Sequence, residues 1–244
     1  MENLKDKVVL VVGGGSGIGL GIGVAFAKEG SRVILAARTA SALEDAKKLP
    51  DVGAKLTTRV ADATNRAEIN ELVAWVTKDI GPIDILVYSA GVNVPKRTFA
   101  DIDPAEFDRV LGINATGAFN SFHAVLPGMR ARKSGLILNI VSIGGLRTIK
   151  VAGLPYTASK YAQAAIGNMA NLEVLDEGVR VTNIYPGEAE TPLVNKRPVP
   201  PSAEQRARML QCEDIADMAV AVAKLPPRAT VPELVITPRH MPLL

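Results

Sequence analysis

Short runs of aliphatic and β-branched residues recur along the 244-residue chain, and within them apolar residues do not alternate strictly with polar ones. Such runs predict strands that are covered on both faces, because a strand with one exposed face carries a polar residue at every second position. The gap between successive runs is always long enough for a helix. The predicted strands are residues 7–12, 32–37, 55–60, 83–88, 136–141, 180–185 and 233–238.

Amphipathic or small-residue stretches fill most of the gaps and predict helices. A strand that alternates with a helix implies right-handed crossovers and a parallel sheet. The pattern predicts an α/β fold: a Rossmann-type, doubly wound parallel sheet of about seven strands with helices on both faces. No repeat or linker divides residues 1–244, so we expect a single domain. The predicted helices are residues 18–29, 41–49, 65–79, 104–131, 156–176 and 213–224.

The longest stretch without a predicted element is residues 186–205, which contains five prolines and follows the sixth predicted strand. Ligands of an open parallel sheet lie beyond the carboxyl ends of its strands, and this segment leaves from such an end. Long loops inside a domain are usually functional or mobile. We expect a mobile substrate loop here; a surface loop without a function is the alternative.

Composition limits the partners and the cellular location that we expect for this protein. The net charge is +3, but Lys and Arg are scattered, which argues against a nucleic-acid partner. Cys212 is the only cysteine, so an intramolecular disulfide or a multi-cysteine metal site is excluded. The N-terminus lacks a signal-peptide pattern, and no apolar run is long enough to span a membrane. We expect a cytoplasmic protein with no membrane partner.

A glycine-rich turn directly after the first predicted strand is the first candidate for chemistry. Gly13, Gly17 and Gly19 are among five glycines within seven residues. Glycines let the backbone approach a pyrophosphate, whose charge the N–H groups of the following helix meet. Nucleotide binding therefore explains the turn better than a structural role alone. After the second predicted strand the chain has Arg38, which favours the 2′-phosphate of NADP(H) over NAD(H).

A second candidate is the pair Tyr156 and Lys160 at the start of a small-residue helix. Residues four apart share a helix face, so the phenol and the ammonium can meet. A nearby positive charge favours the phenolate and makes tyrosine a general acid or base near neutral pH. A core tyrosine with a solvated lysine is the alternative for these residues taken alone.

These features occur in order with Asp62, Asn114 and Ser142, with Tyr88-Ser89-Ala90-Gly91, and with Pro-Gly-Glu-Ala-Glu-Thr at 186–191. The sequence thereby resembles the short-chain dehydrogenase/reductase family in its compact single-domain form, over nearly the whole chain. Together with Arg38, the resemblance implies an NADP(H) site. The cofactor-binding residues are then Gly13, Ser16, Gly17, Ile18, Gly19, Arg38, Asp62, Ala63, Ser89, Ala90, Gly91, Tyr156, Lys160, Pro186, Gly187, Ala189 and Thr191.

The chain departs from the family pattern at two places in this site. Val12 stands where a threonine is usual, and Tyr88-Ser89 stands where the family has Asn-Asn. We expect the phosphate-binding turn and the backbone path beside the cofactor to be kept.

The resemblance also implies the catalytic residues and a reaction without a metal. In the direction of reduction, Ser142 would stabilise the substrate oxygen and Tyr156 would deliver the proton. Lys160 would lower the pKa of Tyr156 and hold the nicotinamide ribose, while Asn114 would anchor a water for proton relay. The implied activity is that of an NAD(P)-dependent oxidoreductase acting on CH–OH or C=O groups.

The sequence says less about the substrate. Residues 92–98, 143–154 and 187–205 are expected to line its pocket and are largely apolar, so we expect a hydrophobic ketone or aldehyde. Arg97, Arg147 and Lys150 in these segments are interpreted as solvated cations; an interaction with an acidic group of the substrate is the alternative. His123 and His240 lie away from every motif, so we interpret His123 as a helix packing or surface residue and His240 as part of the tail.

Family members are commonly homodimers or homotetramers through two long helices, which correspond here to 104–131 and 156–176. The small residues Ala158, Ala162, Ala165 and Gly167 would permit close helix packing, inside the subunit or between subunits. We therefore expect a homo-oligomer.

Two other functions remain open from the sequence. One is a regulatory protein that binds NADP(H) without turnover, which would not need all four catalytic residues. The other is an epimerase or dehydratase on the same fold, because proton abstraction beside a carbonyl can use the same tyrosine.

Overall fold

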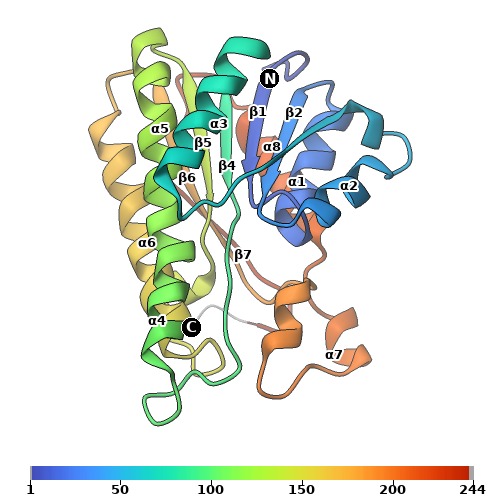
Figure 1. Ribbon diagram of the computed structural model, residues 1–244, viewed down its shortest axis with the longest axis vertical. Helices are drawn as coiled ribbons and strands as arrows, with labels where there is room; N and C mark the ends of the chain where they lie inside the picture. Colours follow the sequence, from blue (N-terminus) through green and yellow to red (C-terminus); the bar gives the residue numbers. More distant parts are fainter. Residues whose placement is uncertain (1, 242–244) are drawn as a thin grey trace.

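A seven-stranded sheet lies at the centre of the computed structural model, which describes residues 2–241 (Figure 1). All neighbouring strands run parallel, in the order β3-β2-β1-β4-β5-β6-β7. This confirms the predicted fold, and each strand ends within two residues of the run that predicted it. The strands are β1 (Val8–Val12), β2 (Arg32–Ala37), β3 (Leu56–Val60), β4 (Ile85–Tyr88), β5 (Gly135–Ile140), β6 (Val179–Pro186) and β7 (Glu233–Ile236).

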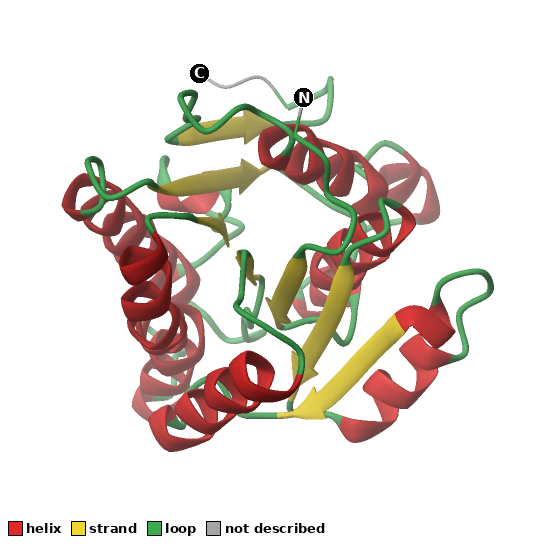
Figure 2. Ribbon diagram, turned by 90° about the horizontal axis from the view of Figure 1, so that it is seen from above, coloured by secondary structure: helices red, strands yellow, loops and turns green. Residues whose placement is uncertain are grey.

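The central strands are buried on both faces, which explains their unbroken apolar runs. In β1, Val9 and Val11 belong to one core cluster, whereas Val8 and Leu10 belong to the other. Helices α1, α2 and α8 pack on the first face, and α3, α5 and α6 pack on the second (Figure 2). The α-helices are α1 (Gly17–Lys28), α2 (Ala40–Lys47), α3 (Arg66–Asp79), α4 (Pro104–Leu111), α5 (Gly117–Arg132), α6 (Leu154–Glu173), α7 (Ala203–Ala207) and α8 (Cys212–Ala223).

The helix predicted at residues 104–131 is divided in two. A π-helical turn, η2 (Gly112–Thr116), joins α4 to α5 without a break in the chain direction. A π turn adds a residue to the helical repeat, and such turns often occur at functional sites. This turn contains Asn114, so it determines where that side chain points.

Residues 186–205 contain more regular structure than the sequence predicts. A 3₁₀ helix, η4 (Pro192–Lys196), and the start of α7 lie within them, and Ala189 forms a β-bridge with Leu210. Glu190 and Arg206 form an ion pair of 2.7 Å, which connects the segment to α7. The mobility expected for this segment stays a prediction.

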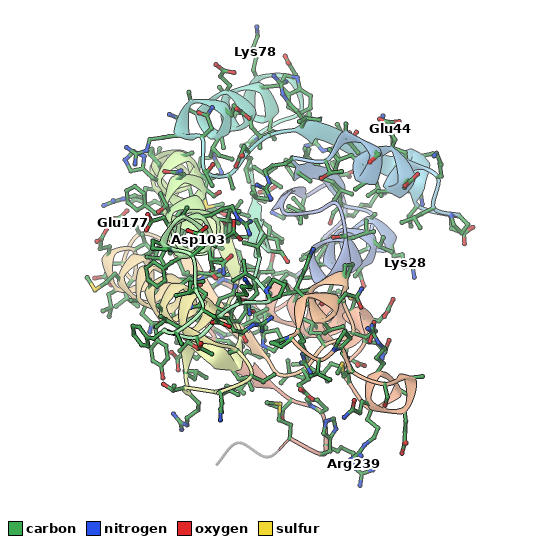
Figure 3. The ribbon with its side chains drawn as sticks, turned by 60° about the horizontal axis from the view of Figure 1, so that its bottom comes forward. Lys28, Glu44, Lys78, Asp103, Glu177 and Arg239 are labelled. Atoms are coloured by element: carbon green, nitrogen blue, oxygen red, sulfur yellow. The ribbon has the colours of Figure 1, made fainter. Side chains whose placement is uncertain are left out.

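Charged side chains such as Lys28 in α1, Glu44 in α2, Lys78 in α3 and Arg239 in the turn after β7 lie around the periphery (Figure 3). Cys212 is half-buried, and burial raises the pKa of its thiol to about 11, which agrees with a packing role. No helix within residues 2–241 has the length and apolar character needed to cross a membrane.

The strand order determines where a ligand can bind. The chain passes from β1 to β2 and β3 on one side, and then returns to place β4 on the other side of β1. At such a reversal the connections leave a crevice beyond the carboxyl ends of the strands. The segments that follow β1, β4 and β5 all meet there.

Candidate active site

The glycine-rich turn after β1 packs closely against another segment. A side chain at Gly13 would place its Cβ 2.3 Å from the backbone nitrogen of Ala90, and one at Gly19 would place it 2.3 Å from the carbonyl oxygen of Gly13. Gly13 and Gly17 have φ angles of 88° and 55°, which glycine adopts without strain. All three glycines of the motif are therefore required by the geometry of the turn.

A cleft of about 490 Å³ runs from this turn past the ends of β2 and β4, within the range of roughly 300–1,000 Å³ that is typical of ligand sites. The side chain of Ser16 makes no capping hydrogen bond with α1, so the first N–H groups of that helix are left for an anion. These features fit a dinucleotide. The cleft is lined by most of the predicted cofactor residues: Gly13, Ser16, Gly17, Ile18, Arg38, Asp62, Ala63, Ser89, Ala90, Gly91, Tyr156, Lys160 and Thr191.

Four predicted cofactor residues lie outside that lining. Gly19 packs beneath the turn, against Gly13. Pro186, Gly187 and Ala189 line a second, neighbouring cavity, and the N–H of Gly187 donates to the carbonyl of Ile236 at 2.8 Å. The stretch that ends at Thr191 thus lies between the two cavities.

Arg38 projects from the end of β2 at the rim of the cleft and is exposed. Within residues 2–241 it has no hydrogen-bond or ion-pair partner, so its guanidinium is available to an anion in the cleft. Asp62 uses Oδ1 to accept hydrogen bonds from the N–H and the hydroxyl of Thr64. This arrangement fixes the turn that carries Asp62 and Ala63.

Asn114 connects the cleft wall to the helix that carries Tyr156 and Lys160. Its Oδ1 accepts from the N–H of Val92 at 2.8 Å, and its Nδ2 donates to the carbonyl of Val92 at 3.0 Å and to Ser159 Oγ at 2.9 Å. Through these contacts Asn114 connects the segment after β4 with helix α6. Its role in anchoring a water stays a prediction.

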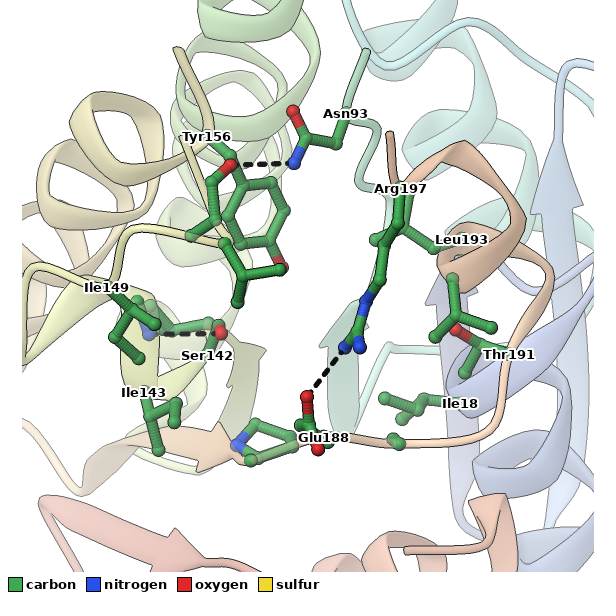
Figure 4. Close-up of a pocket in the computed structure, with 18 of the residues that line it drawn as sticks. Ile18, Asn93, Ser142, Ile143, Ile149, Tyr156, Glu188, Thr191, Leu193 and Arg197 are labelled. Atoms are coloured by element: carbon green, nitrogen blue, oxygen red, sulfur yellow. Dashed lines mark hydrogen bonds and ion pairs between the residues drawn. The ribbon is translucent and has the colours of Figure 1, made fainter. Parts of the chain in front are cut away.

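Ser142 and Tyr156 meet at the boundary between the two cavities. Ser142 Oγ accepts from the N–H of Gly144 at 3.1 Å, which leaves the hydroxyl proton available for donation. The same hydroxyl interacts with the Tyr156 phenol. Tyr156 lines both cavities, and Figure 4 shows it beside Ser142 at the edge of the second one. Its phenol can therefore reach a small molecule next to a cofactor.

Lys160 is 3% exposed, and its Nζ lies 5.6 Å from the centroid of the Tyr156 ring. The two side chains thus share a helix face, as the spacing predicts. Nζ donates to the carbonyl of Ile140 at 3.1 Å and to Gln163 Oε1 at 2.6 Å. Burial lowers the pKa of Lys160 to about 7, because the ammonium is charged and the neutral amine is not.

The pKa of Tyr156 is raised in the protein without a cofactor, and the lowering of this pKa by Lys160 stays a prediction. Burial raises the pKa of this phenol, and the interaction with Ser142 opposes the effect only in part. Burial disfavours the phenolate, and it also disfavours the ammonium whose charge would stabilise that phenolate.

A buried chain of amide groups extends from Lys160 through the sheet. The amide of Gln163 donates to Asn139 Oδ1 at 2.6 Å, and Asn139 Nδ2 donates to Asn183 Oδ1 at 2.7 Å. Each amide orients the next, so the oxygen of Gln163 is directed at the lysine. The sequence does not single out Gln163, because it lies within a run of small helical residues.

The second cavity measures about 140 Å³, below the roughly 300–1,000 Å³ of sites for drug-sized ligands. The three predicted segments 92–98, 143–154 and 187–205 all contribute to it. The small volume and the largely apolar wall indicate a small ligand. Its apolar lining includes Ile18, Ile143, Ile149, Val151, Leu193, Val194 and Met241.

The burial and the positions of the charged residues at this cavity differ from those expected from the sequence. Arg97 is 5% exposed and therefore not a solvated cation. Arg197 Nη2 lies 3.0 Å from Glu188 Oε1 (Figure 4), and His240 Nε2 lies 3.2 Å from Glu188 Oε2. His240 is thus beside the site, whereas His123 packs on Phe119 in α5, with ring centroids 5.6 Å apart. No local pattern in the sequence distinguishes Glu188 or Arg197 from other charged residues.

Comparisons with known proteins agree with this geometry. A family model described as short chain dehydrogenase matches residues 7–200. An uncharacterized oxidoreductase of Staphylococcus saprophyticus is 36% identical, with 98% of this chain and 100% of that protein covered. The glycine betaine reductase ATRR of Emericella nidulans is 35% identical over 98% of this chain, but the chain spans only 19% of that longer protein.

Solved structures show the same fold with a cofactor present. The closed form of serine dehydrogenase complexed with NADP⁺ has a TM-score of 0.88 and 28% identity, with 97% of this chain and 96% of that chain covered. A variant of actinorhodin polyketide ketoreductase with NADPH has a TM-score of 0.84 and 30% identity, with 97% of each chain covered.

Proposed function

Because the chain belongs to the short-chain dehydrogenase family and is an NAD(P)-dependent dehydrogenase or reductase, we propose that it uses NADP(H) to interconvert a small ketone or aldehyde and its alcohol. The observation that carries the proposal is the position of Tyr156, which lines both the dinucleotide cleft and the small apolar cavity. A carbonyl bound in that cavity lies beside both the proton donor and the cofactor cleft.

NADP(H), when bound in the cleft, supplies or accepts the hydride. In the direction of reduction the carbonyl carbon gains that hydride, and its oxygen gains the proton of the Tyr156 phenol. The raised pKa of Tyr156 keeps this proton in place at neutral pH. Ser142 accepts from the N–H of Gly144 and interacts with the Tyr156 phenol, so its hydroxyl lies beside the proton donor and donates to the same oxygen. The apolar wall holds the rest of the substrate.

NADPH oxidation by the purified protein tests this proposal against small apolar ketones and aldehydes, with polyol carbonyls for comparison. We expect turnover of the apolar carbonyls, and a Tyr156→Phe variant to lose at least about 100-fold in kcat, as general-acid catalysis is worth roughly 10²–10⁴. Tyr161→Phe, an exposed tyrosine on the same helix, is the matched control and should retain activity. Turnover that survives in Tyr156→Phe would contradict the assigned role.

The same assay separates the two alternative functions. NADPH binding without turnover would support the regulatory protein, and conversion of a substrate without NADPH consumption would support the epimerase or dehydratase.

The preference for NADP(H) is supported by Arg38, which lies at the cleft without a partner among the described residues. A hydrogen bond to a charged group contributes about 1.5–3 kcal/mol, or about 10- to 100-fold in affinity. Arg38→Ala should therefore raise the KM for NADPH by about that factor and leave the KM for NADH unchanged. Equal effects on both cofactors would refute the preference.

The proposal also includes the cytoplasmic location and the homo-oligomer expected from the sequence. The oligomer is supported by an apolar groove on α5 and α6, which is lined by Phe119, Phe122, His123, Leu126, Pro127, Arg130, Ala165, Ile166, Met169, Ala170 and Glu173. Ala165 is exposed in this groove, whereas Gly167 packs inside the subunit, against Asn183.

A further inference from the structure

The small cavity beside Tyr156 has charged groups in an otherwise apolar wall. Of the residues within 2–241 that line it, the charged ones are Arg97, Arg197 and Glu188. The lining therefore has one positive charge that no negative charge in the lining balances. Inside a protein, where the effective dielectric constant is low, such a charge acts strongly on anything that enters.

Arg97 is the source of the imbalance. It is 5% exposed, and no carboxylate within residues 2–241 forms an ion pair with it. Its Nη atoms donate to the carbonyls of Val151 and Lys196, which are neutral, and its Nε has no hydrogen-bond partner in the described part of the chain. Buried charges are normally paired. Burial, followed by repulsion from Arg197, lowers the pKa of Arg97, which shows how poorly its charge is compensated.

Arg197 is the cation that a ligand can contact. Its side chain is 19% exposed, and it forms an ion pair with Glu188 through Nη2. A guanidinium has five N–H donors in a planar fork that matches a carboxylate. Glu188 partly screens this charge, but it also interacts with His240 through its other oxygen.

We propose that the cavity binds a small carbonyl compound that also carries a carboxylate, with the carboxylate held by Arg197 in the field of the buried Arg97. The substrate class is thus an oxo acid or the corresponding hydroxy acid. One net positive charge balances a singly charged carboxylate better than a doubly charged phosphate, and the volume of about 140 Å³ excludes a large ligand. The inference rests on the proposed function, since it assigns a substrate class to the same site.

Matched acids and esters test this inference. We would measure NADPH oxidation with 4-oxopentanoate, 5-oxohexanoate and 6-oxoheptanoate, each beside its methyl ester, so that charge changes while the carbonyl does not. For at least one chain length, kcat/KM for the acid should exceed that for the ester tenfold or more. The same acid, and not its ester, should raise the melting temperature of the NADP⁺ complex, which reports binding independently of turnover.

Three variants assign the effect to the cavity. Arg197→Gln should reduce the acid-to-ester ratio at least tenfold. Glu188→Gln should increase the ratio severalfold, because it removes the negative charge that pairs with Arg197 and so raises the net positive charge of the lining. If the Arg197–Glu188 pair were merely structural, the acid-to-ester ratio would fall in both variants. Lys150→Gln, an exposed lysine in a neighbouring segment, is the control and should leave the ratio unchanged.

Arg97 needs two variants because it also connects segments through its carbonyl contacts. Arg97→Gln should reduce the ratio, and Arg97→Lys, which keeps the charge, should preserve most of it. If Arg97→Gln does not fold, Arg97→Lys and the Arg197 and Glu188 variants still decide the question.

The outcomes separate this inference from the proposed function. Turnover of neutral ketones with no preference for acids, and no selective stabilisation by acids, would overturn the inference alone. No turnover of any carbonyl would overturn the proposed function. In that case selective stabilisation of the NADP⁺ complex by an acid would still support the carboxylate site, and its absence would reject it.

Discussion

Lys160 is a buried ionisable residue, and its titration has a consequence for stability. The pKa is about 7 in the folded protein, against the ordinary 10.5. Between these values the unfolded chain binds a proton that the folded chain does not, so the free energy of unfolding rises with pH. The contribution is about 1.4 kcal/mol per pH unit from pH 7 to about 10.5, and it is flat below pH 7.

A Lys160→Met variant should remove this slope. The variant lacks the buried ammonium, so relative to the wild type it should be most stable at or below pH 7 and lose that advantage as the pH rises. Urea unfolding of the cofactor-free proteins at pH 6, 7, 8 and 9 measures the difference directly. Lys150→Met, at an exposed position, should follow the wild type. Parallel profiles for wild type and Lys160→Met would show that Lys160 keeps its ordinary pKa.

Gln163 acts through Lys160 as a positioning residue. A Gln163→Met variant keeps most of the volume but removes the acceptor for Nζ and the donor for Asn139. We expect a loss of about 1–3 kcal/mol in the free energy of unfolding, since a buried amide loses its partner, and a shift of the Lys160 titration below pH 7. Gln163→Glu should shift it above pH 7, because a carboxylate favours the ammonium. If the two variants shift the pH profile in the same direction, Gln163 only packs.

The residues that the sequence identifies best are those whose type is required by a local cause. Gly13 and Gly19 have no room for a Cβ, and Tyr156 and Lys160 share a face because they lie one turn apart. Arg97 and Gln163 could not be identified in this way. Their importance depends on burial and on partners far along the chain, which no local pattern records.

At the scale of elements, hydrophobic runs locate all seven strands because both faces of the sheet are buried. The same reasoning merges α4, η2 and α5 into one helix, since a π turn changes the period by a single residue within an unbroken apolar pattern. It also gives no structure to residues 186–205. The β-bridge there pairs Ala189 with Leu210, and Asn195 of the 3₁₀ helix accepts a hydrogen bond from Arg206; both partners lie outside the segment.

The segment 186–205 is joined to α7 mainly by Arg206, which contacts Glu190, Asn195 and the carbonyl of Pro201. Arg206→Ala should release this segment and leave Glu190 half-buried without its cation. We expect faster proteolytic cleavage within 186–205 and a severalfold higher KM for the carbonyl substrate. The loss in global stability should be only about 1 kcal/mol. Arg208→Ala, an exposed neighbour, is the matched control. Equal cleavage rates in the two variants would mean that Arg206 does not hold the segment.

At the scale of the whole molecule, the apolar groove on α5 and α6 is not covered by other described residues. α5 and α6 lie side by side (Figure 1), and Phe119 and Met169 on them are 42% and 54% exposed. Exposed apolar patches with polar rims mark interaction sites. The rim here has Glu173 and Arg130, and Arg130 forms an ion pair with Glu177 within the subunit. A two-fold axis brings the same patch of two copies together, so the apolar centre of the groove on one copy meets that on the other.

Met169→Glu should therefore convert the homo-oligomer into a smaller species. The substitution buries a carboxylate in the apolar centre of the contact, twice for each two-fold axis, at a cost of several kcal/mol per unpaired charge. Sedimentation at micromolar concentration measures the change in mass. Val60→Glu, an exposed apolar position at the end of β3, is the control and should keep the wild-type mass. A monomeric wild type, or a Met169→Glu variant of unchanged mass, would show that this groove is not the interface.

The same two proteins also test the single domain expected from the sequence. A single cooperative unfolding transition in both of them would support it.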